Sequence, residues 1–450
     1  MFKTFRNAFK VKEIRKKLLY TFIALIIVRL GTLLPAPAIN REFTKSFFES
    51  INLGFFGNLT GGAFNKMSIF ALSISPYITA SIIMQLLTIV IPALEELQKE
   101  GEDGRKKINN LTRYIAVGFA ALEALALAIG FGNQGALENG ITFTNVVLIV
   151  ASFTAGSTFL MWLGEKITKN GVGNGISIIL LINIVSTMPA DFITLFNRFI
   201  KGKPIANSIL AVVIITAVIL FTIVFVVLLQ DGQRKVPVQY AKKVQGRRML
   251  GGQSSHIPIK VNTSGVIPVI FASSLMSLPI VVASFVGVYP DRTTIGRKIL
   301  KVLDQGSWLR INFTNFDFGE FKYSIGLLIY IVLIIFFAYF YTSITFNPIE
   351  IANNLKKQGG FIPGIRPGKP TSDYLGKVLN RIIFIGAIGL IIVSVIPMFF
   401  SGAFNAQVSF GGTSLIITPT IIISDVTPKL TCALKAPEKN IGITETIINP

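Results

Sequence analysis

Long apolar stretches follow one another along most of this chain, and they constrain its fold more than any other feature. A helix needs about 20 residues to cross the roughly 30 Å hydrocarbon core of a bilayer, and most of the stretches are that long. The chain is 51% hydrophobic and 14% charged, and its sequence lacks the period-two alternation of membrane strands. We therefore predict an all-α polytopic membrane protein with about ten transmembrane helices. The strong stretches are 18–34, 69–91, 114–130, 144–163, 176–188, 206–229, 264–287, 324–346 and 382–400, with a weaker one at 410–424.

The lysines and arginines predict the orientation of the spans, because basic residues concentrate in cytoplasmic loops. With the N-terminus in the cytoplasm, the predicted cytoplasmic segments carry more than twice as many Lys and Arg as the outer segments. Ten spans then return the chain to its starting side. We expect both termini to be cytoplasmic.

Two polar, basic loops, 230–263 and 347–381, separate apolar stretches on the predicted cytoplasmic side. Loop lysines and arginines that only set topology and touch anionic lipids would explain the net charge of +21. These loops are longer than that role requires, and they carry basic residues far from the membrane. Their length favours docking to a polyanionic partner, through backbone phosphate or acidic side chains.

Residues for catalysis are nearly absent. The chain has one histidine, His256, and one cysteine, Cys432, so it offers no metal-ligating cluster and no Cys–His pair. It also lacks nucleotide-binding fingerprints. We predict no catalytic residue, no metal and no cofactor.

Two charged residues within predicted spans need separate explanations. Glu123 in the third span is the one clear intramembrane acid, with Glu165 at the cytoplasmic end of the fourth. Such acids serve proton relays when they are paired in the bundle interior. Arg29 lies near the outer end of the first span, where its side chain can snorkel to the interface.

Glycine, proline and hydroxyl residues mark two regions that depart from regular spans. Residues 54–68 predict a short amphipathic helix that is broken at Gly61 and Gly62 and continues into the second span at 69–91; an ordinary outer loop is the alternative. The second and seventh spans are both rich in Ser, Thr and Pro. Such spans can form a seam that opens, or simply pack statically through small residues.

Seven blocks of sequence carry a family resemblance. They are IFALSISPYITASIIMQLL (69–87), KEGEDGRKKINNLTRY (99–114), FLMWLGEKITKNGVGNGISII (159–179), YAKKVQGRR (240–248), HIPIKVNTSGVIPVIFASS (256–274), FNPIEIANNLKKQGGFIPGIRPGKPT (346–371) and FGGTSLII (410–417). In this order and spacing they resemble the SecY family, the channel-forming subunits of the general protein-translocation machinery. As a set the blocks are highly specific.

The resemblance implies an hourglass channel of two pseudo-symmetric halves, spans 1–5 and 6–10. It divides the chain into a cytoplasmic N-terminus (1–17), an N-terminal half (18–205), a C-terminal half (206–424) and an atypical tail (425–450). A ring of apolar side chains would seal the waist, a plug at about 55–67 would rest beneath it, and spans 2 and 7 would form a lateral gate. By resemblance, the ring positions are Ile74, Ile78, Leu180, Ile270, Ser274 and Ile417. The plug residues are Phe56, Gly57, Asn58, Gly61 and Gly62, and the gate residues are Ser75, Pro76, Gln85, Asn262 and Ser274.

The resemblance also implies partners for the basic loops. Arg247, Arg248 and Arg366 match the positions that dock the ribosome or the motor ATPase SecA. Further implied partners are the small subunits SecE and SecG, signal sequences and nascent chains, and anionic lipids. We expect a multi-pass protein of the plasma (inner) membrane that moves unfolded secretory chains and releases apolar helices into lipid.

Two other functions remain open from the residues alone. An ion-coupled secondary transporter would use Glu123 as its coupling acid, and a ribosome anchor without a pore would explain the loops only. One stretch departs from the family: after Ile417, Thr418-Pro419 interrupts the apolar pattern. A frameshift or a wrongly assigned terminus is one hypothesis for this change.

Overall fold

The computed structural model describes residues 11–40, 60–132, 135–138, 140–202, 204–240, 243–245, 248–250, 254–285, 296, 309–311, 321–323 and 325–403. Five of the predicted site residues lie outside this part of the chain: Phe56, Gly57, Asn58, Arg247 and Ile417. The predicted tenth span and the tail also lie outside it.

Helices make up most of the described chain. In chain order they are α2 (Lys12–Gly31), α5 (Ser75–Val90), α6 (Pro92–Lys99), α7 (Glu102–Gly132), α8 (Phe143–Asn170), α9 (Gly175–Phe199), α10 (Ile205–Asp231), α11 (Ile267–Phe285), α13 (Ile325–Thr345), α14 (Pro348–Lys357) and α15 (Lys369–Ala403). Each of the nine strong apolar stretches overlaps one of them. By length and composition, five described helices can cross a membrane, or six with the bent pair α5–α6. The predicted all-α polytopic class is confirmed.

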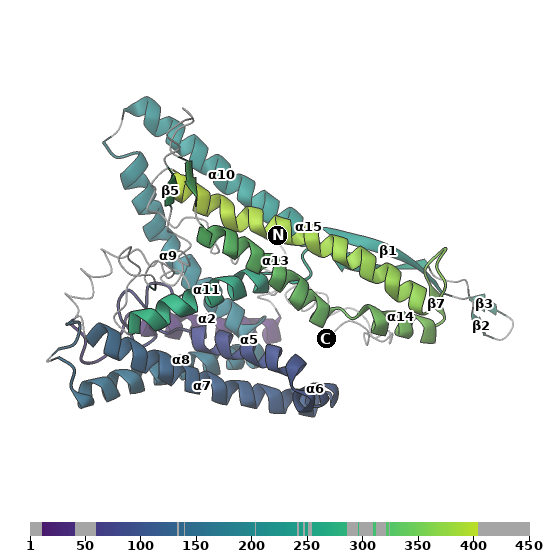
Figure 1. The fold of residues 1–450 in the computed structure, drawn as a ribbon, viewed down its shortest axis with the longest axis horizontal. Coiled ribbons are helices and arrows are strands. Elements are labelled where there is room, and N and C mark those ends of the chain that lie inside the picture. Colours follow the sequence, from purple (N-terminus) through teal and green to yellow (C-terminus); the bar gives the residue numbers. More distant parts are fainter. Residues whose placement is uncertain are drawn as a thin grey trace.

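The helices fall into two groups that meet near α11. Helices α5, α7 and α8 lie together in the lower part of Figure 1, and α10, α13 and α15 lie in its upper part. Helix α11 contacts α13 of the upper group and α7 of the lower group. The seventh predicted span therefore lies where the two groups of helices join.

The predicted second span is helical over only part of its length. Residues 60–67 and 69–74 form turns, and Ser68 between them pairs with Pro35 in an isolated antiparallel bridge. Helix α5 begins at Ser75 with Pro76 in its first turn, a position that proline favours. The prediction that the helix of the second span begins at residue 69 was therefore wrong. Met67 and Ser73 have φ values of 45° and 50°, a conformation that L residues adopt at a cost. Such backbone cannot extend a helix.

This irregular segment, residues 60–74, is packed closely by helices on two sides. The Ile69 amide donates to the Leu34 carbonyl at 3.0 Å. A Cβ atom on Gly31 of α2 would overlap the Phe70 ring, and one on Gly156 of α8 would overlap the Ile69 carbonyl. Glycine at both positions allows the helices to approach the segment at van der Waals distance.

Gly156→Ala is therefore expected to destabilise the protein by about 1–3 kcal/mol, because the added methyl group displaces the Ile69 backbone. Gly118→Ala on α7 is the matched control, since a Cβ there meets no described atom within 4 Å. The fraction of detergent-solubilised protein that stays monodisperse after heating measures the difference. Equal behaviour of the two variants would contradict the close packing of α8 on the segment.

The predicted basic loops contain strands, which were not among the elements expected from the sequence. Strand β1 (Gln233–Tyr240) pairs antiparallel with β4 (Ser254–Lys260), and its end pairs with β7 (Gly360–Phe361) from the second loop. Val236, Val238 and Ile259 of this sheet are buried against α15 and its neighbours. The two loops are thus joined in one sheet, which Figure 1 shows at the end of the molecule that also carries α14. Short pairs are formed by β2 (Lys243–Gln245) with β3 (Arg248–Leu250) and by β5 (Leu309–Ile311) with β6 (Phe321–Tyr323).

Candidate functional site

A buried apolar cluster, here called the central cluster, joins five segments of the chain. It draws side chains from α9, α10, α13 and α15 and from residues 266–276, which include most of the first half of α11. Its buried members are Leu180, Ile184, Val226, Leu229, Val266, Val269, Phe271, Ala272, Met276, Tyr330, Ile334, Phe337, Leu390 and Val393. Ile78 and Ile82 of α5 pack against it, so both predicted halves of the chain contribute to this cluster.

Three of the six predicted ring positions, Ile78, Leu180 and Ile270, lie in or against this cluster. Leu180 is a member, and Ile78 and Ile270 pack against it. Ile74 is fully buried in a neighbouring cluster, which Ile78 also contacts. Ser274 lies one turn after Ile270 on α11, on the same face, and is half-buried. Branched apolar side chains from facing helices can form a constriction that excludes water. The arrangement of these positions is compatible with the predicted ring.

The predicted gate residues occupy different environments. Ser75 and Pro76 begin α5, and Gln85 donates to Ser81 of the same helix at 3.5 Å. Asn262 is 5% exposed, and its side-chain amide has no hydrogen-bond partner among the described residues. The structure does not join Gln85 to Asn262. It instead adds α7 to the seam, since α7 contacts α11.

Arg29 does not snorkel as the sequence predicted. Its Nη1 atom donates to the Gly61 carbonyl at 3.1 Å and to Ser186 Oγ of α9 at 2.9 Å. The first span, the predicted plug region and the fifth span therefore meet at one guanidinium. An arginine within an apolar span was the signal that could have revealed this contact, because such residues usually have an interior partner.

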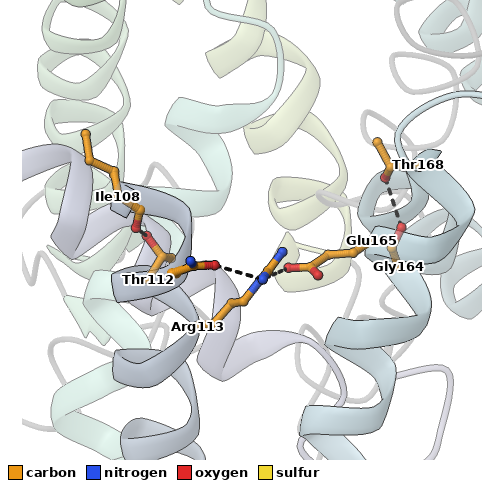
Figure 2. Close-up of polar contacts among 7 residues, drawn as sticks. Ile108, Thr112, Arg113, Gly164, Glu165 and Thr168 are labelled. Carbon is orange, nitrogen blue, oxygen red and sulfur yellow. Dashed lines mark hydrogen bonds and ion pairs between the residues drawn. The ribbon is translucent and has the colours of Figure 1, made fainter. Parts of the chain in front are cut away.

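Glu165, one of the two acids noted from the sequence, is paired. Figure 2 shows it on α8 facing Arg113 of α7, whose Nε atom lies 2.6 Å from Glu165 Oε1. The Arg113 Nη1 atom also donates to Asn110 Oδ1 at 2.9 Å. The two side chains of the pair are 43% and 29% exposed, so it contributes about 0–1 kcal/mol to stability. The ion pair joins α7 to α8.

Glu123 on α7 has a different environment. It is half-buried and forms no hydrogen bond or ion pair with another described residue. Groups of three or more metal-ligating side chains do not occur in the described part of the chain.

Arg366 is exposed in the turn that joins β7 to α15. Gly364 and Gly368 on either side have φ values of 81° and 104°, which glycine adopts readily. Thr371 Oγ1 donates to the Arg366 carbonyl at 2.8 Å and fixes the backbone of this turn. Because β7 pairs with β1, the Arg366 turn is joined to the sheet of the first loop, the loop in which Arg248 begins β3.

Comparisons with known proteins agree on one family. A family model described as SecY matches residues 68–426, a range that continues past Thr418-Pro419. The chain is 41% identical over 425 residues to the protein translocase subunit SecY of Halalkalibacterium halodurans, covering 93% of this chain and 94% of that one. It is 40% identical over 428 residues to the subunit of Thermotoga maritima, covering 93% and 92%. Among solved structures, Sec61 in the canine ribosome–channel complex from the endoplasmic reticulum aligns with a TM-score of 0.59 at 18% identity, over 94% of this chain and 93% of that chain.

Proposed function

Because the chain belongs to the SecY family of protein translocase subunits, we propose that its two halves enclose a pore through which unfolded secretory polypeptides cross the plasma membrane. The observation that carries the proposal is the central cluster, where Ile78 of α5 packs with Leu180 of α9 and Ile270 beside residues of α10, α13 and α15. A seal built from side chains of several helices can widen when those helices move apart. It closes again because the apolar surfaces repack.

The lateral exit would lie between α5 with α7 on one side and α11 on the other. Helix α11 contains Pro279, and α5 ends at a 100° bend before Pro92. Small and hydroxyl side chains make only weak contacts between spans. A seam of this kind is suited to open toward lipid, so that an apolar helix can leave the pore sideways.

The sheet formed by β4, β1 and β7 would dock the partners that drive transport, the ribosome or SecA. Arg366 supports this role because it is exposed on a turn that the β1–β7 pairing holds in place. The planar guanidinium of arginine binds phosphate or carboxylate through two hydrogen bonds. SecE and SecG would complete the complex, with both termini of this chain in the cytoplasm.

The described residues do not form the site that a secondary transporter would require. A coupling acid needs paired charges in the bundle interior. Glu165 pairs with Arg113 at a half-buried position, and Glu123 has no charged partner in the part of the chain that the structure describes. Membership of the SecY family supports a protein-conducting channel and not a secondary transporter.

Reconstitution tests the proposed function. Proteoliposomes that contain this chain with SecE and SecG should protect a secretory precursor from external protease when SecA and ATP are added. Liposomes without this chain serve as the control. If precursor protection were equal with and without this chain, the proposal would fail.

Docking makes a separate prediction. Arg247→Glu with Arg248→Glu should weaken ribosome binding at least about tenfold, and binding of the unmodified chain should fall steeply between low and high salt, because phosphate contacts release counterions. Arg366→Glu should stall SecA-driven transport while membrane insertion of the protein stays normal. Sedimentation of ribosomes with proteoliposomes measures the first effect and protease protection the second.

Lys369→Glu on the first turn of α15 is the control of equal charge change for the Arg366 variant. It should have the smaller effect, because docking depends on the geometry of the Arg366 turn as well as on charge. If ribosome binding did not depend on salt and was unchanged by Arg247→Glu with Arg248→Glu, the docking role of the loops would be refuted.

A further inference from the structure

Arg29 makes contacts that the sealing ring, the gate and the docking loops do not explain. Its guanidinium lies half-buried in a predicted membrane span. One nitrogen donates to the carbonyl of Gly61, to Ser186 Oγ and, at 3.4 Å, to Thr32 Oγ1. Ser186 Oγ in turn donates to the Asn183 carbonyl at 2.7 Å, which orients its lone pairs toward Arg29. The arginine thus bonds α2 and α9 to the start of the irregular segment 60–74.

Gly61 is shaped for this contact. Its φ is +64°, and a Cβ atom there would lie 3.1 Å from both Asn183 Cα and Ser186 Oγ. The backbone at Gly61 therefore touches α9 directly. Gly62 has a similar φ of +78°, but a Cβ on it would meet no described atom within 4 Å.

The far end of the same segment is also held by α9. Asn183 Nδ2 donates to Ser73 Oγ at 3.1 Å, and both residues are buried. Ser73 has a φ of 50°, a strained conformation that persists only where the surroundings enforce it. Both ends of the irregular segment are thus hydrogen-bonded to α9, one through Arg29 and Ser186 and the other through Asn183.

We propose that Arg29 is a positioning residue whose hydrogen bonds hold the irregular segment 60–74 against α9, a set of contacts called the latch below. The strength of the latch sets how easily the resting channel opens. This inference rests on the proposed function, because it assigns a part in the seal to a segment that precedes α5. When the segment leaves α9, the charged guanidinium loses its bonds to Gly61 and Ser186. That loss is costly away from bulk water, so the latch favours the closed state until an entering polypeptide displaces the segment.

The first test compares side chains around the latch. Arg29→Met keeps an apolar chain but removes every donor, and Ser186→Ala removes one acceptor. Resting ion conductance in planar bilayers should rise about tenfold in Arg29→Met and less in Ser186→Ala, while protease-protected transport is retained. Arg29→Lys should give an intermediate conductance. Thr187→Ala is the matched control, since Thr187 Oγ1 donates to Ile184 of its own helix.

The second test uses the two glycines and does not disturb the arginine. Gly61→Ala and Gly62→Ala impose the same backbone strain, but only the Gly61 methyl group pushes against α9. Gly61→Ala should raise resting conductance relative to Gly62→Ala at equal yield of folded protein. If Arg29→Met fails to fold, the comparison of these two glycine variants tests the latch by itself.

The outcomes separate the latch from the proposed function. Raised conductance with transport retained supports the latch, because a purely structural role would lower transport and yield together. Variants that transport normally and remain as tight as the unmodified chain would overturn it. An unmodified chain that transports no precursor would instead contradict the proposed function.

Discussion

A channel that carries Ile78→Gly and Ile270→Gly is expected to conduct ions at rest, at least about tenfold above the unmodified chain. Both side chains pack against the central cluster from different halves of the protein. Their removal leaves a gap that water can enter, and a hydrated gap lowers the cost of ion passage. Single-channel recording in planar bilayers, with the partner subunits present and no substrate, measures the effect.

Glycine also weakens helices, so the control must carry the same change elsewhere. Ile209→Gly with Ile223→Gly on α10 removes two isoleucines that are exposed on the surface of the bundle. This control should stay as tight as the unmodified chain. Two double variants with equal conductance would refute the assignment of Ile78 and Ile270 to the seal.

A covalent bond across the seam is expected to abolish transport. Cysteines would replace Ser75 or Ile82 on α5 and Ile270 or Ser274 on α11, after Cys432 is replaced so that no other thiol is present. A disulfide requires Cα atoms within about 7 Å, so only pairs whose bond is verified by mass spectrometry enter the comparison. Oxidised protein should neither insert apolar helices nor accept signal sequences.

Reduction of the same sample should restore both activities, and each single cysteine should be insensitive to oxidation. These controls distinguish the effect of the disulfide from nonspecific oxidative damage to the protein. Full activity in a verified, oxidised crosslink would mean that substrates do not pass between α5 and α11.

The spans could be anticipated from the sequence because long apolar runs admit few alternatives in a bilayer. Periodicity alone does not bring Ile78, Leu180 and Ile270 together, since they lie on three different helices. The family resemblance supplied these positions. The structure brings all three to one cluster, and their function as a ring stays a prediction.

Other features depended on tertiary contacts that no local pattern encodes. Residues 69–74 are as apolar as a span, yet Ser73 adopts a positive φ and is bonded to Asn183, far along the chain. Strands β1 and β7 come from two loops more than a hundred residues apart. Arg29 was expected at the interface, but its acceptors are a backbone carbonyl and a hydroxyl supplied by other segments.

Photocrosslinking from the seal tests whether polypeptides pass through the central cluster. A photoreactive amino acid replaces Ile270, and a secretory precursor is stalled during transport by a folded domain at its C-terminus. We expect a covalent adduct between this chain and the stalled precursor from position 270, and none from Phe221, which is exposed on α10. Adducts of equal yield from both positions, or none from position 270 while transport proceeds, would contradict passage of polypeptides through the pore of this protein.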